Sequence, residues 1–83
     1  MAKQDKLIEG LRNNFKGVRF NDACKIAEMI GFTRQGGKGG HQAYRRPGEP
    51  KLLNFQDRGG YIVPYQARQL LEMVEKYWGC DDE

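Results

Sequence analysis

Three segments of the chain repeat apolar residues with the spacing of an amphipathic helix. The first covers Lys3–Asn14, and the second runs from an N-cap at Asn21 to Ile30. The third starts at Pro64, a residue suited to the first position of a helix. Its apolar stripe is the most regular in the chain and consists of Ala67, Leu70, Leu71, Val74, Tyr77 and Trp78. We therefore expect three helices, each with one buried face.

Between the second and third helices, short extended segments alternate with turn residues. Strands are predicted at 32–34, 41–46 and 51–56, with a glycine-rich turn at 35–40 and a Pro-Gly turn at 47–50. The order α-α-β-β-β-α predicts an α+β fold of two layers, in which helices pack on one face of a three-stranded antiparallel sheet. The other face would stay open to a ligand. Residues 61–63 either extend this sheet or lead directly into the last helix.

The length of 83 residues corresponds to a single domain, 1–83, with an acidic tail at 80–83. No apolar run is long enough to span a membrane, and no apolar segment follows Met1–Asp5, so we expect no signal peptide and a cytoplasmic location. Cys24, Cys80 and a single histidine do not provide a zinc site of ordinary spacing, and we expect no metal and no cofactor. The formal charge of +3 is compatible with a polyanionic partner but does not require one.

The charge is concentrated between Arg34 and Arg58, where six Lys and Arg residues stand against Glu49 and Asp57. Basic side chains around an accessible glycine turn are suited to phosphate groups. The alternative is a flexible hairpin with solvated charges. The turn is not a nucleotide-binding P-loop, because Gly39 follows Lys38 where that motif has Ser or Thr before a helix. It is not a dinucleotide fingerprint either, since no strand–helix–strand unit surrounds it.

His41 follows this turn and is the main candidate for chemistry. Strand alternation puts it on the same face as Arg45. An imidazole can take and return a proton near neutral pH, and RNA carries its own nucleophile, the 2′-hydroxyl. With cations to hold the phosphate, His41 would suffice in outline for RNA cleavage without metal. The alternative is a histidine that is structural or merely exposed.

Several motifs of this region resemble the HicA toxin family, also called YcfA-like. They are the Gly-Phe-Thr-Arg-Gln run at 31–35, the Lys38–Arg45 segment with His41, a Pro-Gly turn, a short strand and the helix-opening Pro64. The resemblance covers roughly 20–77. It implies a fold similar to a double-stranded-RNA-binding domain, a ribosome-independent mRNA interferase activity, and a HicB-like antitoxin as partner. It also implies that His41 is the essential histidine and that Lys38 is the basic residue of the motif.

Charge, turn geometry and resemblance together predict a site for mRNA with His41 as its catalytic residue. The predicted RNA-binding residues are Lys38, Gly39, Gly40, Arg34, Arg45 and Tyr44. For Tyr44, packing in the core is an alternative to stacking on a base. Tyr61 and Tyr65 flank the last connection and would either donate a proton to the leaving oxygen or anchor the surface.

Two positions depart from the family pattern. Gly40 stands where the family has serine, and Tyr65 stands where it usually has histidine. These departures leave open a non-catalytic RNA-binding domain of the same fold. A third possibility is an interaction module that docks a protein on its open sheet face.

Overall fold

The computed structural model describes residues 3–78, with side chains described from residue 6 onward. The elements are α1 (Lys3–Asn13), a 3-10 turn η1 (Phe15–Gly17), α2 (Phe20–Met29), β1 (Thr33–Gly36), β2 (His41–Arg45), β3 (Leu53–Gln56) and α3 (Pro64–Tyr77). The predicted α+β class with a three-stranded antiparallel sheet is confirmed. None of the helices described is long and apolar enough to cross a membrane. Cys80 and the acidic tail lie outside the described residues.

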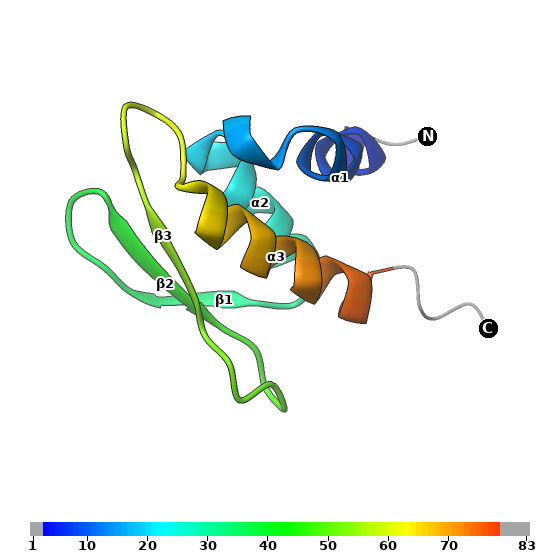
Figure 1. Cartoon of the computed structure of the whole chain (residues 1–83). Helices are drawn as coiled ribbons and strands as arrows, with labels where there is room; N and C mark the ends of the chain where they lie inside the picture. Colours follow the sequence, from blue (N-terminus) through cyan, green and yellow to red (C-terminus); the bar gives the residue numbers. More distant parts are fainter. Residues whose placement is uncertain (1–2, 79–83) are drawn as a thin grey trace.

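The sheet is a meander with β2 in the centre. Its order is β1-β2-β3, and both pairs are antiparallel. Figure 1 shows α2 and α3 on one side of the sheet, whereas the other side carries no element. The register of β1 shifts between Arg34 and Gly36, so Gln35 forms a bulge. β1 continues to Gly36, further than predicted, because this bulge keeps it paired with β2.

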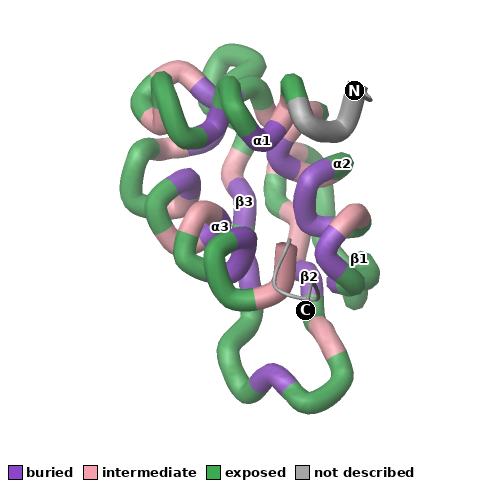
Figure 2. The backbone as a smooth tube through the Cα atoms, turned by 90° about the vertical axis from the view of Figure 1, so that its right-hand side faces the viewer, coloured by how far each residue is buried: buried purple, intermediate pink, exposed green. Residues whose placement is uncertain are grey.

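The core lies between the sheet and the helices, where Figure 2 shows the buried segments of β2, β3, α2 and α3 gathered together. The sheet contributes Tyr44, Leu53 and Phe55, and α3 contributes Ala67, Leu70, Met73 and Val74. These α3 residues lie on the predicted stripe, except Met73, which the spacing did not include. α1 adds Ile8 and Leu11 and packs against α2 and α3.

The start of α2 differs from the prediction. Asn21 was expected to cap the helix, but the helix begins at Phe20, and the N-cap residue Arg19 makes no side-chain capping bond. The Phe20 N–H instead donates to the Gly60 carbonyl at 2.9 Å, and the Ile62 N–H donates to the Val18 carbonyl at 3.0 Å. The segment that precedes α3 therefore pairs with the segment that precedes α2, and it does not extend the sheet.

A buried carboxylate attaches the β2–β3 turn to the end of α3. Glu49 is only 5% exposed, and it accepts hydrogen bonds from Lys76 Nζ at 2.8 Å, from the Tyr77 hydroxyl and from the Lys51 N–H at 3.0 Å. The guanidinium carbon of Arg46 lies 3.8 Å from the centre of the Tyr77 ring, and Arg46 Nε donates to the Ile30 carbonyl at 2.8 Å. Hydrogen bonds from Lys76 and Tyr77 lower the pKa of Glu49 to about 2.

Replacing this carboxylate should make the protein less stable and less sensitive to acid. Because the folded pKa of Glu49 is depressed, its contribution is present above the ordinary pKa of 4.5 and is lost as the pH falls toward 2. We expect Glu49→Gln to lower the Tm at pH 7 by on the order of 10 °C. Between pH 5 and pH 2 the Tm of the variant should also fall less than that of the parent.

Glu75→Gln is the matched control, because Glu75 pairs with Arg12 at 2.9 Å but both side chains are largely exposed. An exposed pair contributes little to stability, so the control should shift the Tm by only a few degrees. Thermal unfolding followed by circular dichroism measures both variants. Equal effects of the two substitutions would contradict the role assigned to Glu49.

Candidate functional site

The glycine-rich turn fixes the position of His41 through its backbone. The His41 N–H donates to the Lys38 carbonyl at 3.0 Å, and the Asp57 N–H donates to the Gly40 carbonyl at 2.7 Å. Gly37 has φ +144°, and a Cβ on it would lie 2.1 Å from the His41 carbonyl oxygen. Glycine is therefore required at this position, both for its dihedral angle and for its contact with His41.

The side chain of His41 lies on the open face of the sheet. Gln42 and Tyr44 pair with the buried residues Phe55 and Leu53, so these two side chains point toward the helices. The alternate residues His41 and Arg45 therefore point outward, and both are exposed. The predicted facing of these strand residues is confirmed, and the imidazole is accessible to a large ligand.

Arg45 and Lys38 are placed differently relative to His41: Arg45 lies further along β2, and Lys38 lies in the preceding turn. Arg45 lies four residues along the strand, about 13 Å from His41 at the usual rise of a β-strand. It would therefore contact a different phosphate from the one at His41. Lys38 is exposed and belongs to the same turn as His41. Of the predicted cations, Lys38 is the one nearest to His41 along the backbone.

Two predicted RNA-binding residues do not lie on the open face. Tyr44 is 3% exposed, its ring lies 5.7 Å from that of Phe55, and its hydroxyl lies beside Cys24. The ring is therefore part of the core, and the prediction that it contacts RNA is wrong. Arg34 is the cross-strand partner of Tyr44, so it projects on the helix side of the sheet near Cys24. The structure does not bring Arg34 together with His41 and Arg45.

Burial favours the protonated forms of both Cys24 and Tyr44. Burial raises the pKa of the Cys24 thiol and raises the pKa of Tyr44 well above its ordinary range. A thiolate nucleophile is therefore disfavoured at Cys24 at neutral pH.

Gly40 is partly buried beside Asp57. A Cβ on Gly40 would lie 3.1 Å from the Cβ of Asp57, which is tighter than an ordinary contact. Asp57 itself is held in place, because its Oδ1 accepts the Gly60 N–H at 2.6 Å. The local packing therefore favours glycine at this position, where the family that the sequence resembles has serine. At Gly39, with φ +55°, an added Cβ would have no neighbour within 4 Å, so this residue serves the turn through its dihedral angle alone.

A small hollow of about 90 Å³ adjoins His41. Besides His41 its lining comprises Gly37, Gln42, Ala43, Asn54, Phe55 and Gln66. The side-chain oxygen of Gln42 is buried and has no hydrogen-bond partner among the described residues. The hollow has room for a phosphate group but not for a whole nucleotide. Of the seven residues that line it, only His41 has a titratable side chain.

Gln66 and Asn54 are site residues that the sequence reasoning missed. Gln66 lies in the first turn of α3, and its Oε1 accepts the Gln56 N–H at 2.8 Å. This bond holds the start of α3 against β3, next to the hollow that contains His41. A polar residue in the first turn of an amphipathic helix carries no signal in the sequence that separates it from a solvated one.

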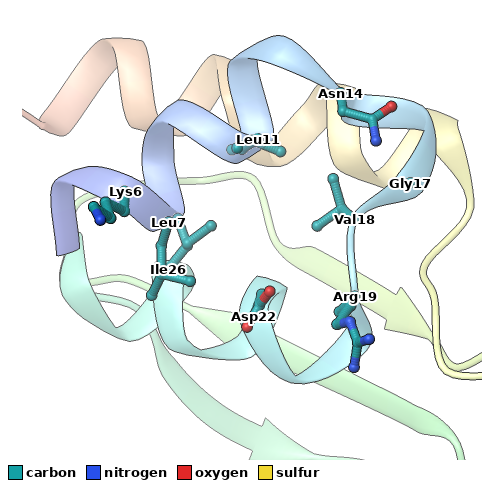
Figure 3. A pocket seen from close by; sticks show the side chains of 10 residues that line it. Lys6, Leu7, Leu11, Asn14, Gly17, Val18, Arg19, Asp22 and Ile26 are labelled. Carbon is teal, nitrogen blue, oxygen red and sulfur yellow. The ribbon is translucent and has the colours of Figure 1, made fainter. Parts of the chain in front are cut away.

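A second hollow, of about 210 Å³, separates α1 from α2 and is shown in Figure 3. Its walls include apolar residues of both helices, with Leu7 and Leu11 on α1 and Ile26 on α2. Lys6, Arg19 and Asp22 also line it, so its charges are mixed and do not select for phosphate. The hollow shows that α1 packs incompletely against α2, and His41 does not line it.

The basic segment 34–58 thus contains three distinct features. His41 and Arg45 lie on the outward face of the sheet, and Lys38 lies in the exposed turn. A hollow large enough for a phosphate group adjoins His41. Among residues 6–78, no group of three His, Cys, Asp or Glu side chains is placed to hold a metal ion. No protein-family model, no curated protein and no solved structure matches the chain.

Proposed function

We propose that this chain is an endoribonuclease of the mRNA interferase type, the toxin of a HicAB-like toxin–antitoxin system, and that it cleaves RNA without a metal ion. The observation that carries the proposal is the placement of His41, which is exposed on the open sheet face and fixed by backbone bonds of the turn. The element order and the open sheet face also support a fold similar to a double-stranded-RNA-binding domain.

In the proposed reaction, His41 removes the proton of a ribose 2′-hydroxyl. The oxygen so activated attacks the adjacent phosphorus, a cyclic phosphate forms, and the bond to the 5′-oxygen of the next nucleotide breaks. The leaving oxygen takes its proton from water or from a tyrosine hydroxyl near the first turn of α3. Lys38 stabilises the negative charge of the phosphate that reacts, and Arg45 holds a neighbouring one.

A HicB-like antitoxin is the proposed protein partner. The open sheet face would be its docking surface, because covering His41 and Arg45 would block access of RNA to both residues. The proposed site of action is the cytoplasm, where mRNA is available.

A non-catalytic RNA-binding domain is the second candidate. The observation that favours it is the hollow beside His41, whose seven lining residues include no second titratable group. Incubation of the purified protein with labelled RNA in excess chelator separates the two functions. Shortened products support the nuclease, whereas binding that weakens with salt and leaves the RNA intact supports the alternative.

Arg45 and Arg34 provide a matched pair that tests which face of the sheet meets RNA. Both are exposed arginines on neighbouring strands, but they project on opposite sides. We expect Arg45→Ala to weaken RNA binding several-fold and to reduce the slope of log affinity against log salt by about 0.7, the loss of one phosphate contact. Arg34→Ala should change both quantities less. Filter binding over a salt series measures them, and the reverse order would contradict the assignment of the open face.

A further inference from the structure

A hollow lined by aromatic and basic side chains lies beside the start of α3. It has a volume of about 370 Å³. Its lining consists of Phe15, Lys16, Pro64, Tyr65 and Arg68. We refer to the hollow that these five residues line as the aromatic hollow. Two of the five are cations and none is a carboxylate, so its charge favours an anionic ligand.

The rings and cations of the aromatic hollow are arranged before any ligand binds. The guanidinium of Arg68 lies 5.3 Å from the centre of the Phe15 ring. Tyr65 is 70% exposed, and its hydroxyl accepts a hydrogen bond from Gln69 Nε2 at 3.3 Å. Exposed rings next to cations are the features by which proteins hold unpaired bases and their phosphates.

A second exposed tyrosine continues this surface toward the loop that precedes α3. Tyr61 is 43% exposed, and the guanidinium of Arg19 lies 5.9 Å from its ring centre. Among the described residues, the large apolar side chains that are exposed are Leu52, Tyr61 and Tyr65. Two of these three therefore flank the same connection, 61–65, each with an arginine nearby.

The first turn of α3 contributes residues to both the aromatic hollow and the hollow beside His41. Pro64 and Tyr65 line the former, and the next residue, Gln66, lines the latter. Gln66 is also bonded to β3, so the relative position of the two hollows is fixed. His41 pairs with Gln56 at the end of β3, and Gln56 is bonded to Gln66. A polynucleotide strand with a phosphate at His41 therefore reaches Tyr65 by passing around this end of β3.

We propose that the aromatic hollow binds an unpaired base of a single-stranded RNA, stacked on Tyr65, with Lys16 and Arg68 on the adjoining phosphates. This inference rests on the proposed function and adds to it the strandedness of the substrate. It also adds a contact with one base at a constant distance from the bond that is cut, without selecting which base stands there. Double-stranded RNA cannot offer an unstacked base and binds this hollow poorly.

The test is the affinity of a fluorescent single-stranded RNA with 2′-O-methyl sugars, which cannot be cleaved, measured by anisotropy at constant salt. Tyr65→Ala is expected to weaken binding about tenfold, the usual effect of removing one stacked base contact. Tyr65→Phe keeps the ring and should stay within about twofold of the parent. Asn21→Ala removes an exposed side chain on α2, outside the hollow and on the other side of the sheet from His41, and should leave the affinity unchanged.

The possible outcomes distinguish a failure of this inference from a failure of the proposed function. If Tyr65→Ala binds like the parent while the parent still cuts RNA, the aromatic hollow is overturned and the nuclease stands. If Tyr65→Phe loses as much affinity as Tyr65→Ala, the hydroxyl and not the ring makes the contact, and stacking is overturned. If an acidic peptide binds with the same dependence on Lys16 and Arg68 while the parent binds no RNA, both the inference and the nuclease are wrong.

Discussion

His41→Ala should reduce RNA cleavage about 100- to 10,000-fold, the usual contribution of a general acid–base group. The loss should come from chemistry alone, because His41 is exposed at the start of β2 and its backbone bonds do not depend on the side chain. An exposed substitution of this kind changes the free energy of unfolding by only about 0.5 kcal/mol. Single-turnover cleavage of a labelled RNA, with the Tm and the RNA affinity of the variant measured alongside, makes the comparison.

A matched control for this variant is available on the neighbouring strand. Thr33 is exposed in β1, and its cross-strand partner is Arg45. Thr33→Ala therefore perturbs the same open face without touching the imidazole, and it should cut RNA within a few-fold of the parent rate. If His41→Ala cuts RNA as fast as Thr33→Ala, His41 is not the catalytic residue.

Gly37→Ala should have the largest effect on stability of any single change in the turn. An added Cβ would lie 2.1 Å from the His41 carbonyl oxygen, and φ is +144°, a region that residues with a side chain rarely adopt. We expect a loss of about 3 kcal/mol or more, equivalent to a fall in Tm of roughly 15 °C. Any folded fraction should also cleave RNA more slowly, because the turn that positions His41 has to move.

The neighbouring glycine provides the comparison for this prediction. A Cβ on Gly36 would have no neighbour within 4 Å, and the φ of Gly36 is not positive. Gly36→Ala should therefore leave the Tm within a few degrees of the parent value. Equal Tm values for Gly36→Ala and Gly37→Ala would show that the turn is not constrained as the structure indicates.

The parts of the fold that follow from local pattern were predictable from the sequence. α3 begins at Pro64 as expected, since proline is favourable at the first helical position and the apolar stripe follows at once. The strand alternation that puts His41 and Arg45 on one face also followed from a period of two. These features depend on residues close together in the chain.

The parts that the sequence did not predict depend on contacts between distant segments. α2 starts at Phe20 and not after Asn21, because Gly60 supplies the acceptor for the first helical N–H. Arg34 lies on the opposite face from Arg45 because it pairs with Tyr44, and the bulge at Gln35 then changes the register of β1. Spacing along the chain does not contain either contact. For the same reason, the spacing of residues along the chain did not indicate that Gln66 and His41 line the same hollow.

The participation of the ribose 2′-hydroxyl is the central claim, and a single substituted oligonucleotide tests it. The bond that the protein cuts is first mapped on a single-stranded RNA, and the nucleotide 5′ to that bond is then replaced by its 2′-deoxy form. We expect cleavage at that bond to stop while the affinity for the oligonucleotide stays within about twofold of the unmodified RNA. Cleavage of the substituted oligonucleotide at the same bond and the same rate would contradict the mechanism assigned to His41.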